Sequence, residues 1–113
     1  MHEMALCESV VRILEEQAHE QGFAKVTVVR MAIGQLSQVE LESFRFCFGA
    51  VAQGTLAAGA QLDIETPDGK AWCLDCRRDI RLARLGEACP DCGGYALQIT
   101  GGEEMRITEL EVE

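Results

Sequence analysis

The chain has 113 residues, of which 48% are hydrophobic and 26% are charged, and only 2 are prolines. This composition is typical of a globular domain and argues against disorder, and no run of about 18 apolar residues is present to span a membrane. The start, Met1-His2-Glu3-Met4, lacks the basic flank and the apolar stretch of a signal peptide. We therefore expect a cytoplasmic protein with no membrane partner.

The net charge is -9, from 10 basic and 19 acidic residues. Proteins that bind phosphate backbones do so by neutralising them with Lys and Arg. No segment of this chain is strongly basic, and residues 67–101 carry equal numbers of basic and acidic groups. The charge pattern therefore argues against a nucleic-acid partner.

The first half of the chain predicts helix, strand and helix. Apolar residues recur at steps of three and four from Met4 to Gln21, which is typical of an amphipathic helix, and Gly22 is suited to end it. The β-branched stretch from Lys25 to Gly34 predicts a strand. The sequence Ser37-Gln38-Val39-Glu40 has the capping-box pattern, with Ser37 as the N-cap of a second helix that ends at Gln53-Gly54.

Two further strands are predicted at Ala60–Thr66 and Met105–Val112. The first should follow a right-handed parallel crossover, and the two should pair antiparallel as a long hairpin. The fold class is therefore α/β, with two helices packed on a small three-stranded mixed sheet and an inserted zinc-ribbon-like module. We expect residues 1–66 and 103–113 to form the α/β domain and residues 67–102 the module.

Four cysteines give the strongest chemical signal in the sequence: Cys73, Cys76, Cys89 and Cys92. Two C-x2-C turns can each place two thiolates on one metal and complete a tetrahedron with bonds of about 2.3 Å, which predicts a closed structural zinc site. The module has few residues for a core of its own, chiefly Trp72, Ile80, Leu82, Leu85, Leu97 and Ile99. It should therefore fold around its metal, which contributes roughly 10–16 kcal/mol in zinc-finger peptides.

Iron in a rubredoxin-like electron carrier is the competing interpretation of these turns. The first turn argues against it, because Arg77 and not a glycine follows Cys76. The two other cysteines, Cys7 and Cys47, lie on the apolar faces of the predicted helices, and we interpret them as inert core residues.

The amino terminus is a second candidate metal site. The amine of Met1, the amide nitrogen of His2 and its imidazole can close two fused chelate rings, a nitrogen environment that Ni(II) and Cu(II) favour. Glu3 at the helix start and Glu40 in the capping box each have a purely structural explanation, and each could also serve the metal. Taken alone, His2 could equally be a solvated side chain at a frayed terminus.

The combination resembles the HypA/HybF family of hydrogenase nickel-incorporation proteins. The similarity rests on the start Met1-His2-Glu3, the pair Leu6-Cys7, the stretch Ile33–Glu40 and the paired cysteine turns, which occur in this order over the whole chain. The resemblance implies a nickel metallochaperone for [NiFe] hydrogenase. It also implies Ni(II) at Met1, His2 and Glu3 with Glu40 as a further carboxylate, and Zn(II) at the four cysteines.

The partners implied by this resemblance are a HypB-type GTPase and the [NiFe] hydrogenase large subunit, with urease as a further recipient. The sequence leaves open whether the chain is a monomer or a homodimer. No nucleophile–base pair, phosphate loop or open catalytic metal is evident, so we do not expect an enzyme. The alternatives are a zinc-ribbon interaction module, which should carry a basic face, and an iron electron carrier, which should be coloured.

Overall fold

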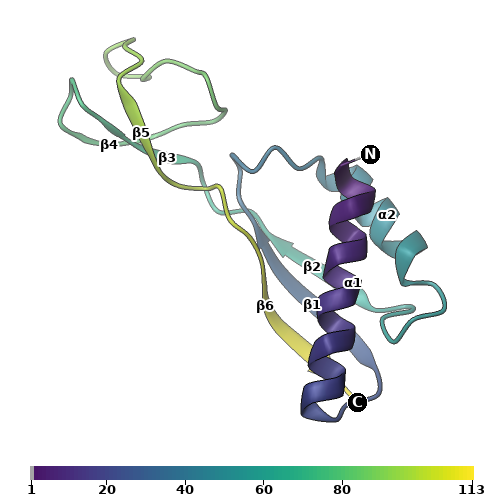
Figure 1. Cartoon of the computed structure of the whole chain (residues 1–113). Helices are drawn as coiled ribbons and strands as arrows, with labels where there is room; N and C mark the ends of the chain where they lie inside the picture. Colours follow the sequence, from purple (N-terminus) through teal and green to yellow (C-terminus); the bar gives the residue numbers. More distant parts are fainter. Residues whose placement is uncertain (1) are drawn as a thin grey trace. The chain divides into compact units, whose positions relative to one another are not determined.

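The computed structural model describes residues 2–113, which form the helices α1 and α2 and the strands β1 to β6 (Figure 1). They fall into two compact units. The first comprises the chain up to Met31, Val39–Asp63 and Ile107–Glu113, and the second comprises Ala32–Gln38 and Ile64–Arg106. No helix in residues 2–113 is long and apolar enough to cross a membrane.

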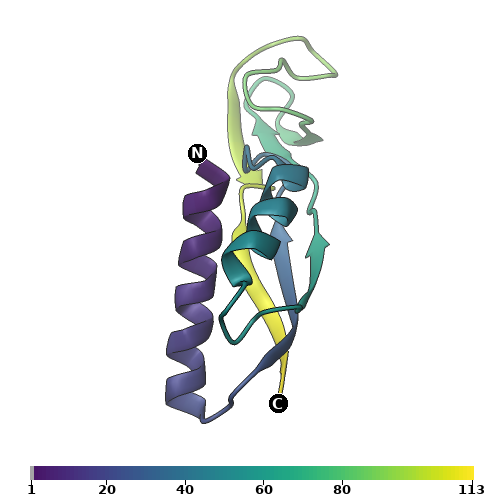
Figure 2. The same cartoon turned by 90° about the vertical axis from the view of Figure 1, so that its right-hand side faces the viewer.

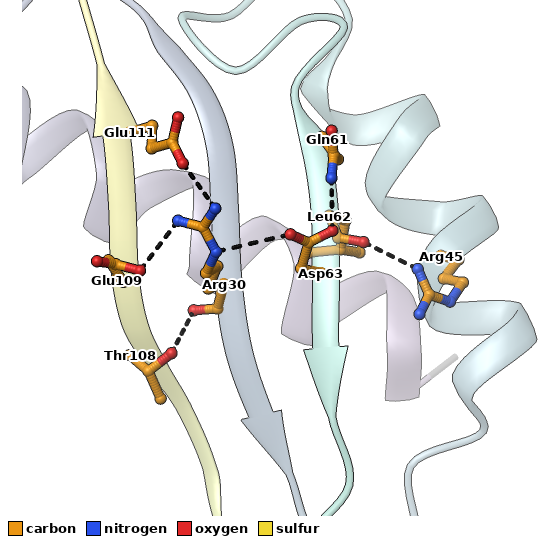
Figure 3. Close-up of polar contacts among 8 residues, drawn as sticks. All are labelled: Arg30, Arg45, Gln61, Leu62, Asp63, Thr108, Glu109 and Glu111. Carbon is orange, nitrogen blue, oxygen red and sulfur yellow. Dashed lines mark hydrogen bonds and ion pairs between the residues drawn. The ribbon is translucent and has the colours of Figure 1, made fainter.

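The sheet of the first unit has the order β2-β1-β6, built from β2 (Gln61–Glu65), β1 (Val26–Ile33) and β6 (Met105–Val112). Figure 3 shows β1 and β2 pointing the same way. Lys25 and Glu113 exchange backbone hydrogen bonds of 3.2 and 2.8 Å beside β1 and β6, which run antiparallel. The sheet is therefore mixed, as predicted. The predicted hairpin between the two outer strands is wrong, because β1 lies between them.

The helices α1 (His2–Gln21) and α2 (Leu41–Ala52) lie next to each other (Figure 2), on the side of the sheet that faces away in Figure 3. The apolar stripe of each helix is buried, as the periodicity predicts. The buried residues are Cys7, Val10, Val11 and Leu14 on α1 and Phe44, Cys47, Phe48 and Ala52 on α2. Gly22, with φ +79°, supplies the expected left-handed residue after α1.

The start of α2 differs from the prediction. The N-cap is Glu40, whose φ of -80° and ψ of 107° are extended and whose carboxylate accepts the N–H of Glu42 at 3.3 Å. Ser37 is therefore not the N-cap. The segment before the helix instead belongs to the second unit, where Leu36 is buried and donates its N–H to the Gly102 carbonyl at 2.7 Å. Tertiary pairing thus overrides the capping-box pattern.

The second unit contains a sheet of order β4-β3-β5, from β4 (Arg78–Arg81), β3 (Lys70–Cys73) and β5 (Leu97–Gly101), all antiparallel. Its core consists of Leu36, Ala71, Cys73, Ile80, Leu82 and Cys89, with Cys76, Leu97 and Ile99 packed against it. Two residues expected in that core are on the surface instead, since Trp72 is 36% and Leu85 is 38% exposed.

Three segments of the second unit meet at glycines. A Cβ added to Gly34 would lie 2.0 Å from the Gly102 carbonyl oxygen, and one added to Gly69 would lie 2.1 Å from the Leu82 carbonyl oxygen. Gly102 adopts a φ of +91°, which other residues rarely adopt. Backbone therefore packs directly on backbone here, and none of the three positions has room for a side chain.

Candidate metal centres

The four cysteines form a compact cluster. Their sulfur atoms all lie within 4.8 Å of one another. Among residues 2–113, they form the group of three or more His, Cys, Asp or Glu side chains that could hold a metal ion. The Cys73 and Cys92 sulfurs are 3.7 Å apart, and those of Cys76 and Cys89 are 4.0 Å apart. A tetrahedron with bonds of about 2.3 Å separates its sulfurs by about 3.8 Å. The cluster therefore fits a tetrahedral thiolate-bound metal.

The two C-x2-C turns have the same backbone conformation. The N–H of Arg77 donates to the Cys73 carbonyl and that of Gly93 to the Cys89 carbonyl, both at 2.8 Å. Both donors lie in the left-handed region, with φ of 55° at Arg77 and 75° at Gly93. The missing glycine in the first turn therefore does not change its geometry, although it places a side chain in a strained conformation.

Backbone amides point at the sulfurs. The N–H of Cys76 lies 3.4 Å from the Cys73 sulfur, and the N–H of Gly94 lies 3.4 Å from the Cys92 sulfur. Hydrogen bonds from the backbone of Cys92 and Asp91 lower the pKa of the Cys89 thiol to about 7. The hydrogen bonds to Cys89 therefore favour its thiolate, which is the ligand form, whereas hydrogen bonds with the Cys92 and Cys73 thiols raise the pKa of Cys76 to about 12.

Two further ligand candidates, His2 and Glu3, lie at the start of α1. Met1 lies outside the described residues, and His2 begins the helix with its side chain 62% exposed. The His2 Nδ1 is 3.5 Å from the Glu3 Oε2. The first N–H groups of a helix have no acceptor within the helix, so the His2 amide nitrogen is not committed to the helical hydrogen-bond ladder.

The structure brings Glu3 and Glu40 together. The backbone N–H of Glu40 donates to the Glu3 Oε2 at 3.3 Å. This hydrogen bond lowers the pKa of the Glu3 carboxyl, and His2 adds a smaller effect in the same direction. The Glu40 carboxylate itself accepts the N–H of Glu42. Two of the predicted nickel residues are therefore joined across 37 positions of sequence, a contact that no local pattern indicates.

The two cysteines predicted as inert are buried, with exposed fractions of 0% for Cys7 and 4% for Cys47. The Cys7 thiol donates to the Phe44 carbonyl at 3.3 Å, and burial raises its pKa to about 12. It stays protonated at neutral pH, which confirms a core role over metal binding or reactivity.

Known proteins resemble this chain over its whole length. Residues 1–112 match the family described as hydrogenase/urease nickel incorporation, metallochaperone, hypA. The hydrogenase maturation factor HypA of Rhodopseudomonas palustris strain BisB5 is 53% identical, and HypA 2 of Bradyrhizobium diazoefficiens is 54% identical, each over 100% of both chains. The solution structure of the Ni metallochaperone HypA from Helicobacter pylori is 28% identical, with a TM-score of 0.68 over 97% of this chain and 96% of that one.

Proposed function

Because this chain belongs to the HypA family of nickel-incorporation metallochaperones, we propose that it binds Ni(II) at its amino terminus and delivers it during maturation of [NiFe] hydrogenase. The family description also names urease, which we propose as a second recipient. The observation that carries this proposal is the contact between Glu3 and Glu40, because it joins the amino-terminal residues to the start of α2.

The proposed nickel site consists of the Met1 amine, the amide and imidazole nitrogens of His2, and carboxylates from Glu3 and Glu40. Three nitrogens joined by short linkages suit the tetragonal environment that Ni(II) favours. His2 is exposed, so the ion can be loaded and removed from outside. The N–H of Glu40 donates to Glu3 Oε2, which also lies 3.5 Å from the His2 Nδ1, and this leaves the other oxygen of Glu3 to support the metal.

The proposed zinc site consists of Cys73, Cys76, Cys89 and Cys92. A zinc ion supplies a closed tetrahedral cross-link between the two turns, with no open position for a substrate. The chain contributes the amides that stabilise the thiolates and a buried cluster that includes Cys73 and Cys89. We propose that residues 1–66 and 103–113 bind nickel and that residues 67–102 bind zinc.

Delivery follows from the chemistry of the amino-terminal site. Its nitrogens bind a proton or a metal, so acid or a competing ligand from a partner releases the nickel. The proposed partners are a HypB-type GTPase, which supplies or accepts the ion, and the hydrogenase large subunit, which receives it. Such a protein transfers a metal and catalyses no reaction. Cu(II) binds nitrogen sites more tightly than Ni(II), so specificity has to come from supply and from partners.

The experiment is a transfer assay with radiolabelled nickel. Nickel-loaded protein is mixed with metal-free hydrogenase large subunit, the two are separated, and nickel in each is counted. We expect transfer from the native chain and none from His2→Gln, while zinc content stays the same in both. Equal transfer from the two proteins would contradict the proposed site, and no transfer from either would contradict the proposed function.

A further inference from the structure

The strand β6 forms one edge of the sheet β2-β1-β6, and no strand in residues 2–113 pairs with its outer side. The opposite edge is protected, because β2 is only 5 residues long and Arg45 donates to its Leu62 carbonyl at 3.0 Å. β6 has 8 residues. A long edge strand with free backbone groups is a template for pairing with another chain.

A groove lies beside this edge, lined by residues of β6 and α1. Its volume is about 270 Å³. Ile13 on the groove wall is 45% exposed, and nearby Val112 on β6 is 43% exposed. The lining residues are Ile13, Leu14, Gln17, Ile107, Thr108, Glu109 and Leu110. An extended peptide added to β6 would place alternate side chains against this apolar wall.

The hydrogen-bond register defines which groups face outward. Lys25 and Glu113 form a pair that exchanges both backbone hydrogen bonds. Since such pairs alternate along antiparallel strands, the N–H group of Glu111 faces β1, and those of Val112 and Leu110 face the open edge. The carboxylates of Glu109 and Glu111 reach Arg30 on one side of the sheet, so the side chain of Leu110 between them points to the other side, where it lines the groove.

The other side of the same edge is acidic. Arg30 pairs with Glu109 at 2.9 Å and with Glu111 at 2.6 Å, and its Nε lies 3.6 Å from Asp63. Figure 3 shows the guanidinium between the two glutamates of β6 and the aspartate of β2. One cation therefore faces three carboxylates, and the side chains of Glu109 and Glu111 remain 64% and 54% exposed. Positively charged side chains on an added strand would neutralise the excess negative charge of Glu109 and Glu111.

We propose that the outer edge of β6, with the groove beside α1, is a docking site for an extended basic segment of a partner protein. The segment alternates apolar residues, which enter the groove, with Lys or Arg, which lie over Glu109 and Glu111. A second copy of this chain is a poorer occupant, because antiparallel pairing of two β6 strands gathers Glu109 and Glu111 of both copies on one face. The site needs neither nickel nor zinc.

The test uses a synthetic peptide, acetyl-Lys-Val-Lys-Val-Lys-Val-Lys-amide, titrated into the zinc-loaded full chain and followed by amide NMR and calorimetry. In the proposed register the Val amides face β6 and the Lys amides face solvent. N-methylation of the Val amides should weaken binding about fivefold for each lost ladder bond, while N-methylation of the Lys amides should leave it unchanged. Shifts and added exchange protection should centre on Leu110 and Val112.

Two protein variants distinguish peptide binding through the groove from binding that depends only on the net charge of the protein. Ile13→Lys should weaken binding at least tenfold, because it places a charge on the apolar wall, whereas Gln53→Lys adds the same charge to an exposed position at the end of α2 and should change little. Equal effects of the two peptide methylations, equal effects of the two variants, or no binding of the parent peptide would each overturn the proposal. Pairing of β6 with a second copy, seen as a dimer with the same amide protection and no peptide, would overturn it also.

Discussion

The Glu3 carboxylate accepts the backbone N–H of Glu40, and four residues further along each helix the Cys7 thiol donates to the Phe44 carbonyl. Both pairs are 37 residues apart in sequence, and both distances are 3.3 Å. α1 and α2 therefore run side by side in a fixed register. This register places Glu3, one of the proposed nickel ligands, at the start of α2.

The Glu3 contact predicts a specific pH dependence of stability. The pKa of Glu3 is lowered in the folded chain, so its contribution is fully present above the pKa of the unfolded state, about 4.3, and is lost as pH falls through the lower folded value. Glu3→Gln should unfold at lower denaturant than the native chain near neutral pH, and this difference should disappear in acid. Urea unfolding at several pH values measures it, and a difference that grows in acid would contradict the contact.

Arg77 predicts a stabilising substitution. It adopts a φ of 55° without being glycine, so Arg77→Gly should relieve left-handed strain and stabilise the zinc-loaded protein by about 0.5–1 kcal/mol. Denaturation followed by the fluorescence of Trp72, next to Cys73, reports on this unit.

The matched control for that substitution is Gly93→Ala in the second turn. Gly93 has a φ of 75° and open space around it, so the change acts through conformation alone and should destabilise by about 1 kcal/mol. Effects of the same sign at Arg77 and Gly93 would refute the equivalence of the two turns.

The close backbone contact between Gly34 and Gly102 in the second unit predicts that a substitution of Gly34 strongly destabilises the protein. Gly34→Ala places its Cβ 2.0 Å from a backbone oxygen of Gly102, so the backbone has to move, at a cost of about 3 kcal/mol. Gly49→Ala is the contrast, because nothing lies within 4 Å of that position and it is inside α2. It should stabilise the protein by up to about 1 kcal/mol. Comparable thermal midpoints for the two variants would contradict the close packing.

Zinc removal should act locally. Cys76→Ser takes one ligand from the cluster, so we expect loss of zinc and of ordered structure in residues 67–102, while α1 and α2 keep their helical circular dichroism signal. Metal analysis and far-ultraviolet circular dichroism test this together. A single transition in which the helices melt with the cysteine turns would contradict independent folding of the two parts.

Local patterns predicted much of this fold. Periodicity located both helices, the strand from Met105 to Val112 matches β6, and the spacing of Cys73, Cys76, Cys89 and Cys92 predicted the cluster that the structure contains. These features depend on residues close in sequence, whose geometry is set by a turn or a helix.

The errors arose where distant segments compete. Ser37 has the capping pattern, but the burial of Leu36 and its bond to Gly102 hold that segment in the second unit. The strand order could not follow from sequence, because β6 pairs with β1 across the whole intervening chain. The Glu3–Glu40 contact depends on a long-range register that no local pattern indicates, and only the family resemblance brought these two residues together.

The most direct test of the account is a nickel titration by calorimetry on zinc-loaded protein with its native amino terminus, beside a matched protein with one additional glycine before Met1. The extension removes the native amine from the chelate and leaves His2, Glu3 and Glu40 in place. We predict that the native chain binds one nickel ion tightly and that the extended chain does not. Equal binding by both proteins, or binding by neither, would contradict an amino-terminal nickel site.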